Sequence, residues 1–144
     1  MLTADDVMLV RASFARVVPV KDAAADLFYA RLFERAPQLR PLFPADLRQQ
    51  KQKLMAALVM AVGALNDLDA VVPKLKALGM RHVGYGATAA HYEVVGDVLL
   101  LTLARALGDA FTPDVRAAWT KVYGVLAATM QAGAAELGEM QAAE

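Results

Sequence analysis

Two histidines are the residues in this chain best suited to bind a metal, because the chain contains no cysteine. The lack of cysteine excludes disulfides, thiolate metal sites and a cysteine nucleophile. With only His82 and His91 present, a zinc site built from several histidines is disfavoured. His82 follows Leu75 and Leu78 at helical spacing, near the end of a predicted amphipathic helix. Two interpretations stay open for His82: a half-exposed histidine favoured by the negative helix end, or an axial metal ligand in an apolar cleft.

Tyr29, Phe43 and Gln50 are further candidates, and each also has a purely structural interpretation. Tyr29 lies four residues from both Ala25 and Phe33, so its ring projects from an apolar helix face. Its hydroxyl either bonds a carbonyl in the core or faces a bound ligand. Phe43 stands in a proline-rich corner, where a packing anchor is expected. Helical spacing alone makes Gln50 a surface glutamine near a helix start.

Several functional classes are disfavoured by composition. The 15 basic and 15 acidic residues cancel, whereas a protein whose main partner is a nucleic acid normally has a basic excess. No glycine-rich phosphate loop is present, no Ser-His-Asp set can be assembled, and the carboxylates form no persuasive acid–base pair.

The elements that must position the candidate residues are predicted to be helices throughout. Leu54, Leu58 and Leu65 share one helix face, and runs of alternating β-branched residues are missing. Proline, glycine and cap residues divide the chain into about seven helical pieces, at 3–18, 20–36, 37–43, 46–66, 73–84, 88–107 and 113–137. The prediction is an all-α fold, with one domain over residues 1–144.

The chain is unusually apolar, with 58% hydrophobic residues among 144, and this composition excludes disorder. A membrane span is not predicted, because the longest stretches without a charge, 54–66 and 122–135, are shorter than the roughly 20 residues that a spanning helix needs. The first residues carry no basic region or apolar signal core, so we expect a cytoplasmic protein.

Three segments taken together resemble a known protein family, although no single residue shows that resemblance. Residues 28–43 have the pattern FYxxLFxxxPxLxxLF, residues 81–83 (RHV) precede HYEVVGDxLL at 91–100, and residues 118–127 are AWTKVYGVLA. In this order the segments resemble single-domain bacterial haemoglobins of the Vitreoscilla type and the globin domain of flavohaemoglobins. The resemblance covers nearly the whole chain and implies a globin fold with helices packed around a haem pocket.

The resemblance implies one haem b and assigns residues to its proximal side. His82 matches the ligand of the haem iron, and Tyr92 matches a tyrosine whose hydroxyl helps to orient that histidine. Phe43 matches the aromatic residue that packs on the porphyrin. Leu78 and Val95 are expected to line the cofactor.

On the distal side, Tyr29 matches the tyrosine whose hydroxyl would donate to a bound dioxygen molecule. Gln50 matches the distal glutamine and Leu54 the apolar residue one turn further on, although the corner after Phe43 is about three residues shorter than in flavohaemoglobins. With no histidine available there, Gln50, Tyr29 or a lysine such as Lys51 or Lys53 remains able to approach the iron in the unliganded state.

One position departs from the family pattern. Family members hydrogen-bond the proximal histidine with a glutamate fifteen residues after the tryptophan of the last helix, and Ala134 stands at that distance from Trp119. Glu136 comes two residues later and points about 200° around the helix. The missing carboxylate argues against peroxidase-like or fast dioxygenase chemistry.

Three functions stay open. The first is reversible binding of dioxygen, carbon monoxide and nitric oxide by a haem protein, as a monomer or homodimer without a nucleic-acid partner. The second is a nitric oxide dioxygenase that depends on a separate reductase. The third is a globin-like interaction or sensor module without haem, in which His82 is structural.

Overall fold

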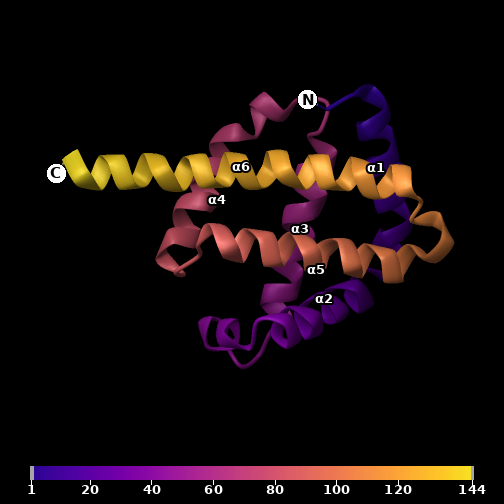
Figure 1. Ribbon diagram of the computed structural model, residues 1–144, viewed down its shortest axis with the longest axis horizontal. Coiled ribbons are helices and arrows are strands. Elements are labelled where there is room, and N and C mark those ends of the chain that lie inside the picture. The colour runs from indigo at the N-terminus through magenta and orange to yellow at the C-terminus, as the bar shows by residue number, and fades with distance from the viewer. Residues whose placement is uncertain (1, 144) are drawn as a thin grey trace.

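The computed structural model describes residues 2–143 and folds them into helices joined by short turns (Figure 1). The α-helices of this part of the chain are α1 (Ala4–Val17), α2 (Lys21–Arg35), α3 (Arg48–Gly63), α4 (Val72–Gly84), α5 (Ala89–Leu107) and α6 (Pro113–Ala143). Four short 3-10 segments join them: η1 (Val18–Val20), η2 (Pro37–Leu42), η3 (Leu68–Ala70) and η4 (Gly108–Ala110). Residues 2–143 contain no strand, which confirms the all-α prediction.

The main differences from the predicted pieces are the end of α6 and the helix type of the third piece. α6 continues to Ala143, beyond the predicted end at 137, and its last turns project past the other helices (Figure 1). The residues after Leu137 are mainly Ala, Glu, Met and Gln, which favour helix and compensate for Gly138. The third predicted piece is the 3-10 segment η2, with Pro41 inside it.

The predicted cap residues hold the helix starts. Thr3 Oγ1 accepts from Asp6 N at 3.1 Å while Asp6 Oδ2 accepts from Thr3 N at 3.0 Å, a reciprocal capping box. At the start of α6, Thr112 Oγ1 accepts from Val115 N at 3.3 Å. These side-chain oxygens satisfy amides that have no partner within the helix.

The core lies where α1, α2, α5 and α6 pack against one another. Trp119 on α6 is 1% exposed, and its Nε1 donates to Ser13 Oγ at 2.8 Å. The same Ser13 hydroxyl lies 2.7 Å from Leu9 O, so the buried polar atoms at this crossing have partners. The helices that carry the candidate residues are thereby fixed to one core.

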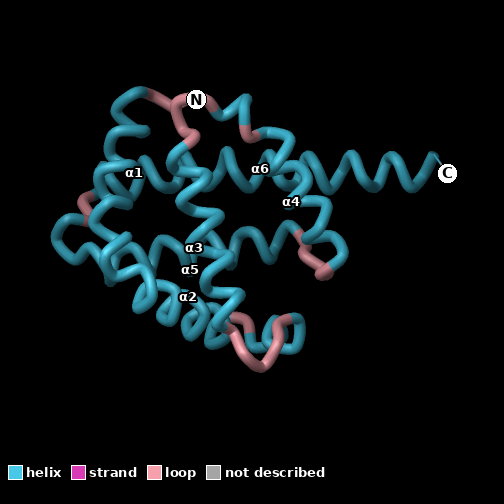
Figure 2. Tube along the Cα trace, turned by 180° about the vertical axis from the view of Figure 1, so that it is seen from behind, coloured by secondary structure: helices cyan, strands magenta, loops and turns pink. Residues whose placement is uncertain are grey.

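α4 packs mainly on α6 (Figure 2). The two backbones touch at a pair of glycines. A Cβ on Gly79 of α4 would overlap the backbone of Met130, and a Cβ on Gly133 of α6 would overlap the backbone of Lys76. Only glycine permits this close approach. Since His82 is on α4, the contact with α6 sets where His82 lies.

No single helix of residues 2–143 is long and apolar enough to cross a membrane. Residues 72–84 and 89–110 meet the length and composition test only as a pair, and they are bent by 114° at their junction.

Candidate functional site

Tyr29 and Gln50 meet where α2 crosses α3. Tyr29 is 4% exposed, and Gln50 is half-buried in the first turn of α3. Gln50 Nε2 donates to the Tyr29 hydroxyl oxygen at 3.1 Å. Helical spacing alone predicted a surface position for Gln50, whereas its side chain bonds the buried Tyr29 hydroxyl.

The hydrogen bond from Gln50 leaves the Tyr29 proton available. A phenol has one proton to donate and also accepts through its oxygen, and here the oxygen is the accepting atom. Burial raises the pKa of Tyr29 above its ordinary value, against the smaller lowering effect of the Gln50 bond. Tyr29 therefore stays protonated at neutral pH and can donate to a further acceptor.

Phe43 joins Tyr29 in a cluster of aromatic rings. The Phe43 centroid lies 5.8 Å from that of Tyr29 and 5.4 Å from that of Phe33, both in edge-on arrangements. Phe28 meets Tyr29 edge-on at 5.1 Å. These geometries are favourable for aromatic pairs and restrict the Tyr29 ring on several sides.

The two lysines next to Gln50 differ in their surroundings. Lys51 Nζ forms an ion pair with Asp26 of α2 at 2.8 Å, so α2 and α3 are linked again one residue from the Tyr29–Gln50 bond. Lys53 is exposed. The ion pair holds the Lys51 ammonium on Asp26.

The two histidines use their rings in different ways. His82, in the last turn of α4, has Nδ1 2.7 Å from Leu78 O. Because a carbonyl only accepts, the proton of neutral His82 is on Nδ1, and the Nε2 lone pair is free to bind a metal. His91 instead accepts through Nδ1 from Thr88 N at 3.1 Å, which places it at the start of α5 as a cap.

Tyr92 lies beside His82, with ring centroids 6.3 Å apart. Its hydroxyl is buried and has no hydrogen-bond partner among the described residues. Burial raises the pKa of Tyr92. An orphaned buried hydroxyl costs free energy, and such a group is typical of a site that a bound molecule completes.

The three aliphatic candidates are all half-buried. Leu54 on α3 and Val95 on α5 pack against the core, and Leu78 lies one turn before His82 on α4. Each side chain keeps part of its apolar surface exposed. The candidates come from separate helices and offer apolar surface to a bound group.

Tyr123 of α6 supports this region, and the spacing argument did not find it. Its hydroxyl donates to Tyr92 O at 2.6 Å, and burial strongly raises its pKa. Gly96 makes room for the ring, since a Cβ there would lie 2.6 Å from Tyr123 Cε2. A glycine inside an otherwise apolar helix was the available signal.

Glu136, near the end of α6, does not direct its carboxylate to His82, because it is paired with a lysine. Glu136 Oε1 accepts from Lys76 Nζ at 2.6 Å, which directs it to the first half of α4. Ala134 is half-buried and has no polar group. The hydrogen bond that the structure gives His82 is the one to Leu78 O.

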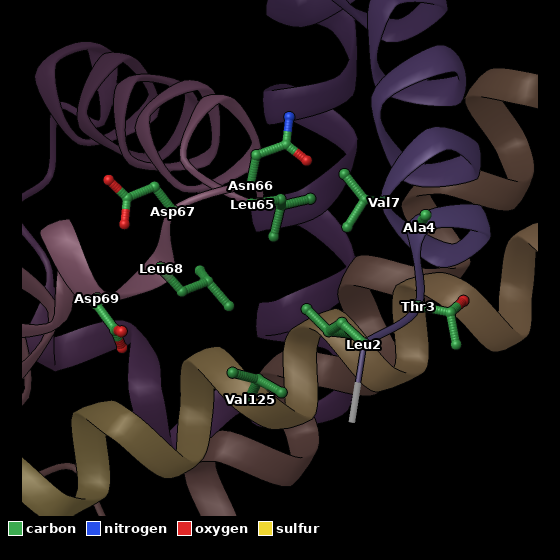
Figure 3. Close-up of a pocket in the computed structure, with 10 residues that line it drawn as sticks. All are labelled: Leu2, Thr3, Ala4, Val7, Leu65, Asn66, Asp67, Leu68, Asp69 and Val125. Carbon is green, nitrogen blue, oxygen red and sulfur yellow. The ribbon is translucent and has the colours of Figure 1, made fainter.

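A cavity of about 490 Å³ lies away from all these residues, between the start of α1, the α3–α4 connection and Val125 of α6 (Figure 3). Asp67 and Asp69 border it, and none of the predicted site residues lines it. A second cavity, of about 370 Å³, lies between α5 and α6 beside Tyr123. Neither cavity contains a cluster of metal-ligating residues in the described part of the chain.

Comparison with known proteins gives consistent matches. The model of the family described as Globin matches residues 26–130. Flavohemoproteins are 36% identical over 69% of this chain in Bacillus subtilis (strain 168), and 32% identical over 88% of it in Bordetella parapertussis (strain 12822 / ATCC BAA-587 / NCTC 13253). The matched segments span 26% and 32% of those two relatives, so this chain corresponds to about a third of their length or less.

A solved structure matches over 99% of both chains, with a TM-score of 0.87 and 28% identity. It is an engineered carbene transferase derived from a protein of Rhodothermus marinus that is provisionally described as a nitric oxide dioxygenase.

Proposed function

The chain belongs to the globin family, and we propose that it binds one haem b through His82 and reversibly binds dioxygen and other diatomic gases. The single observation that carries the gas-binding part is the Tyr29–Gln50 hydrogen bond, which is half-buried and leaves the Tyr29 proton free to donate. Haem binding is supported by the relatives, which are flavohemoproteins.

The residues assigned to the cofactor fit a large apolar group that needs one nitrogen ligand. The Leu78 carbonyl holds the Nδ1 proton of His82 and leaves Nε2 for the metal. Leu54 and Val95 supply apolar surface from two other helices. The buried Tyr92 hydroxyl, which has no partner among the described residues, supports a site that a ligand completes. When bound, the haem would supply the iron at which a diatomic gas is held.

Tyr29 would then select among gases through its hydroxyl. Gln50 bonds the Tyr29 oxygen and orients the phenol, and the aromatic rings of Phe28 and Phe43 restrict its motion and exclude water. A donor in a dry site stabilises a ligand with partial negative charge by about 1–3 kcal/mol. Dioxygen is the diatomic ligand that gains most from this bond.

Replacement of each histidine in turn tests the proposal. The full chain and the variants His82→Ala and His91→Ala are produced in haem-replete cells and examined by absorption spectroscopy. Loss of the Soret band is expected only for His82→Ala, because His91 caps α5. His91→Ala is the matched control for the loss of an imidazole. A band that survives in both variants would refute His82 as the ligand.

Nitric oxide dioxygenation is the second candidate, because the similar structure derives from a protein provisionally described as such an enzyme. The reaction combines nitric oxide, dioxygen and one electron into nitrate, so a separate reductase would have to supply the electron. Steady turnover with a supplied reductase supports this candidate, whereas a single stoichiometric burst counts against it.

The variant Ala134→Glu would sharpen the choice between the two candidates. A carboxylate on this face of α6 would make the proximal histidine a stronger electron donor if it reached the imidazole. Faster nitrate formation in Ala134→Glu is expected if the missing carboxylate limits the wild-type rate; an unchanged rate would exclude that limitation.

A further inference from the structure

We propose that Arg40 is a positioning residue of the distal site. Its guanidinium holds the backbone of the corner between η2 and α3, defined here as residues 43–47. By doing so it keeps Phe43 against Tyr29 and sets where α3 begins. The inference rests on the proposed function, because it assigns one more residue to that site.

The guanidinium of Arg40 bonds three consecutive carbonyls of the corner. Nη1 donates to Phe43 O at 3.2 Å and to Pro44 O at 3.0 Å, and Nη2 donates to Ala45 O at 3.1 Å. These are charge-assisted bonds from one planar fork. A lysine ammonium has a single nitrogen and cannot reproduce the same spread of donors.

The same side chain also contacts the aromatic cluster. The Arg40 guanidinium carbon lies 5.1 Å from the centre of the Phe33 ring, within the range of a cation–π contact. Phe33 packs edge-on against Phe43, whose backbone carbonyl Arg40 also bonds. Arg40 thereby fixes the corner to the rings that surround Tyr29.

The corner determines the position of the first turn of α3. Leu47 precedes α3 and has no polar side chain with which to cap it, but Asp46 Oδ1 in the corner accepts from Arg48 N at 3.0 Å, so the helix start depends on where the corner lies. Lys51 N donates to Leu47 O at 2.9 Å, and Gln50 is the neighbour of Lys51. A displaced corner would shift Gln50 relative to the Tyr29 hydroxyl, which it bonds from another helix.

Arg48 provides a matched control on the same corner. Its guanidinium pairs with Asp46 at 2.6 Å, and its side chain is 86% exposed. Its partner, Asp46, lies outside the aromatic cluster. Loss of an exposed ion pair of this kind is expected to change little.

The experiment compares Arg40→Ala, Arg40→Lys and Arg48→Ala in the full haem-loaded protein. Two quantities are measured: hydrogen exchange of the Phe43 and Lys51 amides, and the dissociation rate of dioxygen. We expect Arg40→Ala to raise both by about tenfold, the effect of losing one charge-assisted hydrogen bond. Arg40→Lys should recover less than half of this effect on a logarithmic scale, and Arg48→Ala should stay within about twofold of wild type.

The proposal is overturned if Arg40→Ala lowers the melting temperature while both rates stay at the wild-type value, because that result describes a merely structural arginine. Equal effects of Arg40→Ala and Arg48→Ala also overturn it. If Arg40→Ala fails to fold, Arg40→Lys decides by the same two rates. If the chain holds no haem, the proposed function fails, and the exchange of the two amides still decides whether Arg40 holds the corner.

Discussion

The Tyr29 side and the His82 side of the proposed haem site are held in different ways. Tyr29 is bonded by a residue of another helix, and the neighbouring pair of Lys51 and Asp26 links the same two helices. His82 is bonded to Leu78 of its own helix, and α4 itself is held by close backbone contact with α6. Side-chain hydrogen bonds between helices thus position the first residue, and packing of a whole helix positions the second.

The difference extends to how completely the polar groups are satisfied. The Tyr29 oxygen already accepts a bond, whereas the buried Tyr92 hydroxyl beside His82 has no partner among the described residues. We infer that the Tyr29 side is organised before a ligand arrives. The His82 side keeps a polar group that the cofactor or an ordered water would satisfy.

Replacement of Gly133 by alanine should have the largest effect. A Cβ there overlaps the backbone of Lys76, so α4 and α6 must separate. We expect Gly133→Ala to lower the free energy of unfolding by about 3 kcal/mol, measured by urea unfolding, and to speed haem loss. The matched control is Gly138→Ala, where nothing lies within 4 Å of the added Cβ. That variant should be neutral or more stable by about 0.5–1 kcal/mol, and equal destabilisation of both would contradict the role of the close contact.

Tyr29→Phe should have the next largest effect, and on ligand release rather than on folding. Loss of a buried donor worth about 1–3 kcal/mol should speed dioxygen dissociation by about 5- to 150-fold, measured by stopped flow. Carbon monoxide dissociation should change far less. Tyr85→Phe is the comparison on the His82 side, because the exposed Tyr85 ring lies 5.5 Å from that of His82 and away from the Tyr29–Gln50 bond. If the dissociation of dioxygen and of carbon monoxide became faster by the same factor, the size of the Tyr29 side chain, and not its hydrogen bond, would control ligand release.

Smaller changes in the free energy of unfolding, of opposite sign, are expected for Tyr92→Phe and Tyr123→Phe, which lie where α5 meets α6. In the haem-free chain, Tyr92→Phe removes an orphaned hydroxyl and should raise the free energy of unfolding by about 1 kcal/mol. Tyr123→Phe removes the 2.6 Å bond to Tyr92 O and should lower it by about the same amount. Urea unfolding measures both. Equal losses in the two variants would show that the Tyr92 hydroxyl has a partner after all.

The smallest effect concerns alkaline pH. Burial raises the pKa of Tyr29, Tyr92 and Tyr123 above the ordinary value of 10.0. The unfolded chain therefore loses these protons first, and the stability that the three tyrosines contribute is constant below about pH 9 and falls as pH rises above about 10. Tyr123→Phe should make that fall less steep in urea titrations between pH 8 and about 11. An unchanged slope would mean that Tyr123 ionises equally easily in both states.

Helical periodicity and cap residues were enough to predict most of the fold. The capping box at Thr3 and the start of α6 after Thr112 follow from side chains that bond nearby amides, so the local sequence contains the information. The continuation of α6 to Ala143 was not predicted: the last helix was expected to end at about 137, but the alanine-rich stretch around Gly138 favours helix.

The contacts of the candidate site were harder to predict because they join distant parts of the chain. The Gln50–Tyr29 bond depends on how α2 crosses α3, and spacing along one helix cannot show that crossing. Arg40 is a different case, because its partners lie only three to five residues further along the chain and become neighbours through the turn of the corner. The capping role of His91 was within reach, since its partner Thr88 is three residues away.

The absorption spectrum of the purified full chain tests the central claim most directly. Protein from haem-replete cells is recorded in the ferric state, in the ferrous state and after addition of carbon monoxide. Haem bound through His82 should give a Soret band whose intensity corresponds to about one haem per chain. This band should shift when carbon monoxide is added. A colourless, stably folded helical protein, or a band that carbon monoxide leaves unchanged, would contradict the claim.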